Sequence, residues 1–358
     1  MSNKLPFSLH TLPIELTYRI LDHLTRTDIL LSLQNVSIRL NSIIHTYHRY
    51  QTITKLTCSF NEITEDDGKY LAYALHNNTT LTKLILNTYP LYSTDAQHLG
   101  QTLTTLHLEC NNINSKKIQY LTDMLQNNTT LTKLILIRNY IGMEGIQHLT
   151  RTLQNNSILN TLHLTGNHIG DKGVQYLSHI LQTNTTLTIL NLGYNNIADD
   201  GLQYLAELLS KNTTITTIDL SANCFSFRGL QYIAQALQDN TTLTNLNVSD
   251  NCIDNECIKY LNIPLQMNRT LTLLNLQNNR IDCEGIRFLA EALHKNTTLT
   301  TLDLEGNKID DNGAQQLAKI LKNNTTINEL NLLANNINNE GIQHLIVALK
   351  YNPVSDYH

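Results

Sequence analysis

Leucine and isoleucine recur along most of the chain in one spacing, Leu-x-x-Leu-x-Leu-x-x-Asn-x-Ile. The segments start at Ile53, Leu81, Leu103, Leu131, Leu159, Leu187, Ile215, Leu243, Leu271, Leu299 and Ile327, which makes eleven units. Successive starts lie 28 residues apart, except for the 22 residues between Leu81 and Leu103. A fixed period of this length predicts an array in which each unit packs only against its neighbours.

The first part of each unit predicts a short strand. In the unit that begins at Leu299, the buried-type residues Leu302 and Leu304 alternate with Thr301 and Asp303. Alternation with a period of two places one face of a strand in the core and the other in solvent. The strands of successive units are therefore expected to pair in parallel.

The second part of each unit predicts a helix. Acidic residues and a glycine, Asp310 to Gly313, stand where a helix begins, because carboxylates favour the positive end of the helix dipole. The expected inward face is Leu317, Ala318, Ile320 and Leu321. Asn323 and Asn324 should end the helix before Thr325 and Thr326 lead into the next strand.

The ninth position of the unit is asparagine in ten of the eleven units, from Asn61 to Asn335. We expect its side-chain amide to bond both the turning backbone and the asparagine of the next unit. The short unit that begins at Leu81 instead has Tyr89 followed by Pro90. We expect its helix, around residues 95–101, to be about a turn short and to leave a local kink or cavity; harmless drift is the alternative.

These repeats resemble the ribonuclease-inhibitor class of leucine-rich repeats, in the uniform 28-residue version of NLR-type receptors. The resemblance implies an α/β fold over residues 53–350, a horseshoe-shaped solenoid with parallel strands inside and helices outside, followed by a tail at residues 351–358. It also implies that the concave strand face binds another protein.

The residues that point into the expected concavity change along the array. Lysines come early, at Lys55, Lys83 and Lys133, whereas acids come late, at Asp219, Asp303, Glu305 and Glu329. Residues that are costly to leave in water lie between them, and they are the predicted partner-binding set: Ile85, His107, Ile135, Ile137, Arg138, His163, Ile189 and Tyr194. Tyr194 and Arg138 are the predicted anchors. The alternative is that these are scattered surface residues of no consequence.

Residues 8–50 do not follow the repeat and predict a small module of three helices. Their pattern, quoted as Leu12-Pro13-Ile14-Glu15-Leu16, Ile20-Leu21-Asp22-His23-Leu24, Asp28 to Leu33 and Val36 to Asn41, resembles an F-box. The resemblance implies contacts with the adaptor subunit of an SCF-type ubiquitin ligase at Leu12, Pro13, Leu16, Ile20, Leu24, Leu30 and Val36. The alternative is that these helices only cap the first repeat.

Charge and composition bear on the kinds of partner and on the cellular location. The formal net charge is −5, so electrostatics gives no reason to expect nucleic acid or an anionic membrane as a partner. The sequence shows neither a signal peptide nor an apolar run that could span a bilayer, which predicts an intracellular location, cytoplasmic or nuclear. Asn-Asn-Thr-Thr segments such as residues 77–80 then have a structural role rather than being glycosylation sites.

Candidate chemistry is sparse. No phosphate-binding loop, nucleophile elbow or zinc-protease helix appears, so we expect no enzyme activity and no cofactor. His107 and His163 occupy the same strand position two units apart, too far for one metal ion. The six cysteines, expected to be buried or half-buried free thiols, are Cys58, Cys110, Cys224, Cys252, Cys257 and Cys283.

Taken together, the two resemblances predict a substrate receptor of an SCF-type ubiquitin ligase, in which the helical module binds the adaptor and the repeats hold a protein substrate. A stand-alone recognition or inhibitor module is the alternative. Activation of a small GTPase is a more remote third possibility.

Overall fold

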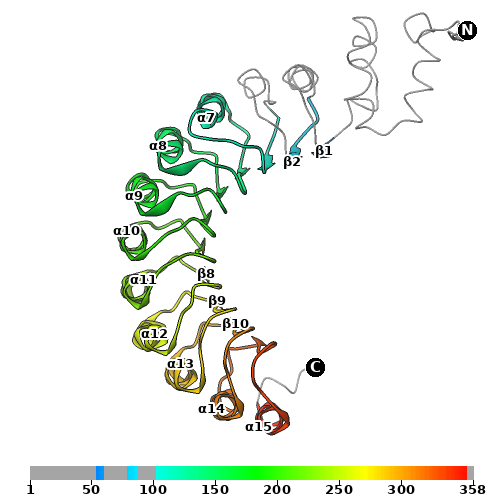
Figure 1. The fold of residues 1–358 in the computed structure, drawn as a ribbon, viewed down its shortest axis with the longest axis vertical. Coiled ribbons are helices and arrows are strands. Elements are labelled where there is room, and N and C mark those ends of the chain that lie inside the picture. Colours follow the sequence, from blue (N-terminus) through cyan, green and yellow to red (C-terminus); the bar gives the residue numbers. More distant parts are fainter. Residues whose placement is uncertain (1–53, 60–78, 88–101, 353–358) are drawn as a thin grey trace, which may run out of the picture. The chain divides into compact units, whose positions relative to one another are not determined.

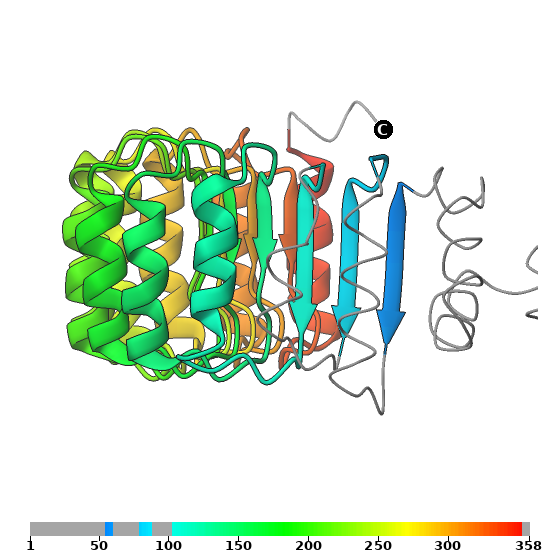
Figure 2. The ribbon, with the colours of Figure 1, turned by 90° about the horizontal axis from the view of Figure 1, so that it is seen from above.

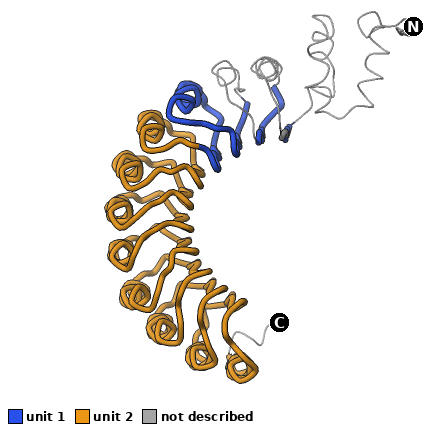
Figure 3. The backbone as a smooth tube through the Cα atoms, in the orientation of Figure 1, with its two compact units in different colours: residues 1–139 blue, residues 140–358 orange. Residues whose placement is uncertain are grey.

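The computed structural model describes residues 54–59, 79–87 and 102–352. The F-box-like segment, with its seven adaptor-binding residues, lies outside these ranges, as do Tyr89, the short helix expected at residues 95–101 and the tail from residue 353. The chain divides into two compact units, residues 1–139 and residues 140–358 (Figure 3).

In its described residues, the first unit contains four strands that pair in parallel and in sequence order. They are β1 (Lys55–Ser59), β2 (Lys83–Asn87), β3 (Thr105–Glu109) and β4 (Lys133–Ile135), with helix α7 (Ile118–Asn127) after β3. Lys55 pairs with Lys83, Lys83 with Thr105, and Thr105 with Lys133. The short repeat therefore keeps its strand in register, and the missing residues fall between β2 and β3.

The second unit repeats strand and helix in strict alternation. Its strands are β5 (Thr161–His163), β6 (Ile189–Asn191), β7 (Thr217–Asp219), β8 (Asn245–Asn247), β9 (Leu273–Asn275), β10 (Thr301–Asp303) and β11 (Glu329–Asn331). Its helices are α8 (Gly142–Leu153), α9 (Gly170–Leu181), α10 (Asp199–Leu209), α11 (Phe227–Asp239), α12 (Asn255–Met267), α13 (Cys283–Lys295), α14 (Asp311–Leu321) and α15 (Asn339–Lys350). Consecutive strands pair in parallel, and within this unit the strands line the concave side and the helices the convex side (Figures 1 and 2).

Leucines fill the space between the strand layer and the helix layer. Leu302 and Leu304 are buried, with 1% and 0% of their surface exposed, while Thr301 and Asp303 between and beside them are half-exposed. Leu317, Ala318 and Leu321 of α14 face the same core, as predicted. Ile320 does not, because it is only half-buried at the groove between two helices.

The ninth-position asparagines form the predicted ladder, although the bonds differ in one respect. The Oδ1 atom of Asn195 accepts the backbone N–H of Asn167 at 2.8 Å, and its Nδ2 donates to the carbonyls of Leu164 and Gly193, both at 2.9 Å. Most of these side chains thus bond the backbone N–H of the neighbouring asparagine rather than its side-chain amide, whereas Asn307 and Asn335 accept the N–H of Ile281 and Ile309. The ladder satisfies turning backbone that neither sheet nor helix serves.

A second row of buried asparagines, which the sequence analysis treated only as helix stops, joins the helix ends. In Asn212, Asn240, Asn268, Asn296 and Asn324, Nδ2 donates to the carbonyl of a leucine 31 residues earlier. The Oδ1 of Asn212 accepts the N–H groups of Thr214 and Ile215 at 2.9 and 2.8 Å. Because Nδ2 is the atom that glycosylation would modify, its burial in these bonds supports the structural interpretation of the Asn-x-Thr segments.

The helix starts of neighbouring repeats are also joined. Asp310 caps α14 by accepting the N–H of Gly313 at 2.9 Å, as its position predicted. The next residue, Asp311, accepts the N–H groups of Asn338 and Gly341 at 2.7 and 3.1 Å, at the start of the following helix. The Asn338 bond is the largest cause that lowers the pKa of Asp311. No helix in the described part of the chain is long and apolar enough to cross a bilayer.

Candidate protein-binding face of the strands

The candidate site is the strand face that the buried leucines leave open. Most strands expose, at least in part, the residues on either side of their central leucine or isoleucine, because side chains alternate across a strand; β5 is an exception, since Thr161 is buried. In β2, for example, Lys83 and Ile85 are half-exposed on either side of Leu84, which is fully buried. The predicted partner-binding residues divide between the two units, with five in the first and three in the second.

In the first unit, three of the predicted residues form one row across adjacent strands. Ile85 pairs with His107, and His107 pairs with Ile135. All three are half-buried. Ile137 is half-buried beyond β4, and Arg138 follows it in a left-handed conformation with φ at 51°. The Arg138 side chain is 72% exposed.

A carboxylate links two of these residues. The Oε1 atom of Glu109 lies 3.8 Å from Arg138 Nη1, and its Oε2 lies 3.7 Å from His107 Nε2. Burial is the main cause that lowers the pKa of His107; Glu109 raises it and Lys83 lowers it, both by less. His107 is therefore neutral near pH 7, and its contact with Glu109 is not an ion pair there. The row presents aliphatic and neutral aromatic surface beside one exposed cation.

In the second unit two of the three predicted residues lie on different rows, and the third, Tyr194, lies beyond the strand. Ile189 pairs with Thr161, whereas His163 pairs with Asn191. Tyr194 follows β6 in a left-handed conformation, with φ at 55° and 65% of its surface exposed. An aromatic ring exposed at a turn offers a large surface that a partner can bury, and tyrosine is enriched among the residues that dominate binding energy.

The second unit also contains a polar row, of which the sequence prediction included only Asp219 and Asp303. It comprises the fifth residue of each repeat from β6 to β11: Asn191, Asp219, Asn247, Asn275, Asp303 and Asn331. Each Oδ1 accepts the backbone N–H two residues later, at 2.8 to 3.1 Å. The signal was present in the sequence as Asn or Asp at a constant repeat position.

The remaining atoms of this row face the concave side. Asn191 Nδ2 donates to Asp219 Oδ2 at 2.7 Å, so these two side chains satisfy each other. Within the described residues, the Nδ2 groups of Asn247 and Asn275 have no hydrogen-bond partner. Glu305 accepts a bond from Asn331 at 2.9 Å, and Glu329 accepts one from Thr301 at 3.2 Å. The later strands thus offer amide donors and carboxylates, which suit a polar or basic partner surface.

The cysteines differ in part from their predicted burial. Cys110 and Cys283 are half-buried and Cys257 is buried, whereas Cys224 and Cys252 are exposed at equivalent turns of neighbouring repeats. Burial is the main cause that raises the pKa of Cys257 to about 12. Among the described residues, no three His, Cys, Asp or Glu side chains converge as a metal site would require.

Comparison with known sequences identifies the repeats. The family model described as "Leucine Rich repeat" matches residues 101–116, 155–178, 183–206, 211–234, 239–261, 268–290 and 295–318. These segments include β3 and the strands from β5 to β10, and the chain therefore carries leucine-rich repeats between residues 101 and 318. A search of the curated proteins found no match to the chain.

Solved structures with similar folds include an internalin (inlF) from Listeria monocytogenes. The two share 19% identity and a TM-score of 0.50, over 89% of this chain and 91% of the internalin chain. At this identity the match indicates a common fold only. Actin-binding site 2 of leiomodin-1 matches at 25% identity with a TM-score of 0.37, over 43% of this chain and 88% of that one.

Proposed function

We propose that this leucine-rich-repeat protein is the substrate-recognition subunit of an SCF-type ubiquitin ligase. Leucine-rich repeats are protein-binding scaffolds, and the strand face described above is the surface on which a substrate would lie. The observation that carries the ligase role is the sequence from Leu12-Pro13 to Asn41, which resembles an F-box, placed directly before the repeats.

In this proposal the chain performs no chemistry itself. The adaptor contacts would come from Leu12, Pro13, Leu16, Ile20, Leu24, Leu30 and Val36. The substrate would be held on the strand face, and the gain would be the raised effective concentration of its lysines near a recruited conjugating enzyme. Tyr194 and Arg138 are the proposed substrate anchors, since both side chains are well exposed at turns that follow strands.

Binding to purified adaptor subunit tests the ligase role. The intact chain should bind, and a Leu12→Ala/Pro13→Ala variant should bind at least about tenfold more weakly, because two apolar contacts are removed from a small interface. Tyr194→Ala is the matched control and should bind the adaptor as the intact chain does. Failure of the intact chain to bind the adaptor would defeat the ligase proposal.

A stand-alone protein-binding module is the second candidate. The observation that favours it is the polar row. All six residues of this row lie on the repeats, between residues 191 and 331, so this surface could bind a protein without the N-terminal segment. Photo-crosslinking groups placed at Tyr194 and Asn275 would capture a partner from cell extract under either proposal, whereas one at Gln235 on the helix side would not. Capture at the strand face together with absent adaptor binding would favour the stand-alone module.

A further inference from the structure

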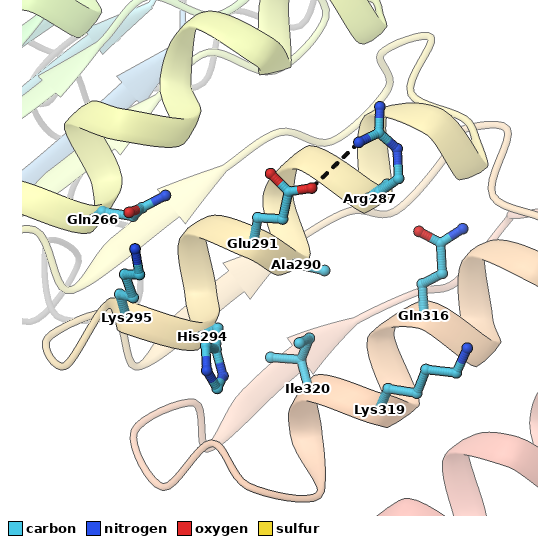
Figure 4. Close-up of a pocket in the computed structure, with 9 residues that line it drawn as sticks. All are labelled: Gln266, Arg287, Ala290, Glu291, His294, Lys295, Gln316, Lys319 and Ile320. Carbon is cyan, nitrogen blue, oxygen red and sulfur yellow. Dashed lines mark hydrogen bonds and ion pairs between the residues drawn. The ribbon is translucent and has the colours of Figure 1, made fainter.

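The convex side of the second unit carries a groove whose charge differs from that of the rest of the chain. The groove has a volume of about 490 Å³ and is formed by α12, α13 and α14 (Figure 4). Its lining residues, named here the basic groove, are Gln266, Arg287, Ala290, Glu291, His294, Lys295, Gln316, Lys319 and Ile320. A volume of this size accommodates a few side chains of a peptide.

The floor of the basic groove is apolar. Ala290 on α13 is 6% exposed. Ile320 on α14 is half-buried and lies outside the leucine core. The neighbouring helix α12 adds Ile263 and Met267, which are 56% and 59% exposed on consecutive turns. They occupy the same repeat positions as Glu291 and Lys295, on the next helix. Asn262 next to Ile263 donates to Glu291 at 2.9 Å, which shows that these helix segments adjoin.

The rim of the groove is cationic. Arg287 Nη1 lies 3.3 Å from Glu291 Oε1, and the Arg287 guanidinium also stacks on the Phe288 ring at 4.3 Å. The carboxylate of Glu291 thus already has an ion pair with Arg287 and a hydrogen bond from Asn262. Lys295 and Lys319 are both exposed and have no acidic partner among the described residues. Their positive charge is left for a ligand to neutralise.

A second groove shows that the repeat itself does not impose this charge. The groove between α9 and α10, about 370 Å³ in volume, is lined at equivalent repeat positions by Ser178, His179 and Glu207 in place of Ala290, Glu291 and Lys319. It therefore has a polar floor and an acidic residue where the basic groove has an apolar floor and a lysine.

We propose that the basic groove is a second docking site, which takes an acidic peptide segment of a partner protein that carries an aliphatic side chain. The aliphatic group would lie on Ala290 and Ile320, with carboxylates at Lys295 and Lys319. A polyphosphate or nucleic-acid ligand fits less well, because the groove's arginine is already paired with Glu291 and its floor, at Ala290 and Ile320, is apolar.

Selection from a library of short random peptides displayed on phage tests this site on the full chain. Phage are first depleted on a Lys295→Glu/Lys319→Glu variant and then selected on the unaltered protein. The retained peptides should be rich in Asp and Glu and contain Leu, Ile or Val. A synthetic peptide from this set should bind the charge-reversed variant at least about tenfold more weakly, and its affinity should fall as salt is raised.

Lys172→Glu/Lys211→Glu is the matched control, since it makes the same charge change on exposed lysines near the second groove. It should leave peptide binding within about twofold of the unaltered protein. The proposal is overturned if depletion leaves no enriched peptides, if the enriched peptides are not acidic, or if the control variant loses as much affinity. Lysine-dependent binding of a single-stranded DNA oligonucleotide that exceeds peptide binding would also overturn it.

Discussion

At the residue scale, the ladder position requires asparagine because it needs a donor and an acceptor in one short side chain. Asn223 Oδ1 accepts the N–H groups of Asn195 and Ile197, both at 3.0 Å. Its Nδ2 donates to the carbonyls of Leu192 and Leu220 at 3.1 and 2.9 Å. Aspartate would lose the donor, and an aliphatic residue would leave three buried backbone groups without partners, since Asn251 Nδ2 also donates to the Leu220 carbonyl.

Replacement of Asn223 by alanine should therefore destabilise the repeats strongly. Each buried backbone group left unsatisfied costs roughly 1–3 kcal/mol, so a loss of at least about 2 kcal/mol in the free energy of unfolding is expected. Urea denaturation followed by circular dichroism measures this change. Gln238→Ala, at an exposed position in helix α11 of the same repeat, is the control and should change stability by less than about 0.5 kcal/mol. Equal losses in the two variants would contradict the ladder's role.

His107 predicts a pH dependence of stability. Its folded-state pKa is lowered, mainly by burial, so the unfolded chain binds a proton more readily than the folded chain. The stability that neutral His107 contributes is complete above the ordinary histidine pKa of about 6.5 and is lost as pH falls through the lowered value. Urea denaturation at pH 7.5 and at pH 5 measures this change, since these values lie about one unit or more on either side of the ordinary pKa. Between the two, His107→Gln should lose less free energy of unfolding than the unaltered protein. Parallel curves for the two would refute the burial effect.

Thiol reactivity should follow exposure rather than sequence position. Cys224 and Cys252 are exposed, whereas Cys257 is buried with its pKa raised to about 12. Because the thiolate is the reactive form, native protein treated with iodoacetamide near pH 8 should be labelled first at the two exposed cysteines. Peptide mass spectrometry over time locates the label. Early labelling of Cys257 would show that α12 opens readily.

At the element scale, the glycine near the start of most of the described helices reflects contact between neighbouring repeats; α12 has Cys257 at that position. In α11, Gly229 donates its N–H to Asp199 Oδ1 at 3.0 Å. A Cβ at this position would lie 2.6 Å from that same oxygen and 3.0 Å from Phe225 Cβ. The close approach allows Asp199 to bond the start of the next helix.

Gly229→Ala should consequently destabilise the protein, although alanine is favoured over glycine in helix interiors by about 1 kcal/mol. The steric conflict breaks the bond to Asp199, and we expect a net loss of about 1–2 kcal/mol in urea denaturation. Gln235→Ala, at an exposed site of the same helix, should be neutral within about 0.5 kcal/mol. Stabilisation by Gly229→Ala would show that the helix can shift away from Asp199 at little cost.

Strands and helices were predictable because their signals are local. The leucine spacing predicted where β2 to β11 lie, and Asp310 predicted where α14 begins. The exposure of Ile320 was not predictable, since it depends on the distance between two helices rather than on either one. The hydrogen bonds of the second asparagine row were not predictable for a similar reason, because their acceptors lie 31 residues away, on another repeat.

At the scale of the whole molecule, the candidate site follows from which side chains the stacked repeats expose together. The row formed by Ile85, His107 and Ile135 was predictable, because register follows from the repeat length. The concave polarity of the second unit was not, because it depends on hydrogen bonds such as that between Asn191 and Asp219. Lys295 and Lys319 of the basic groove were not predicted as binding residues, because they lie on helices and the prediction considered only the strand face.

Position within the array also decides how much each leucine contributes. Leu289 and Leu317 are each 1% exposed, because a following repeat covers them. Leu345 occupies the same repeat position in α15 but is only half-buried, and Ile342 beside it is 44% exposed. Identical residues at identical repeat positions therefore remove different amounts of apolar surface from water.

Leu289→Ala should cost about 3 kcal/mol in the free energy of unfolding, within the range of roughly 2–5 kcal/mol for fully buried leucines. Leu345→Ala should cost less than half of that, because the removed methyl groups are already partly hydrated and the site can relax without leaving a cavity. Urea denaturation of both variants, side by side, measures the difference, with far-ultraviolet circular dichroism to establish that each retains its helices. Equal costs would contradict the prediction, because they would mean that Leu345 is as well covered in solution as Leu289.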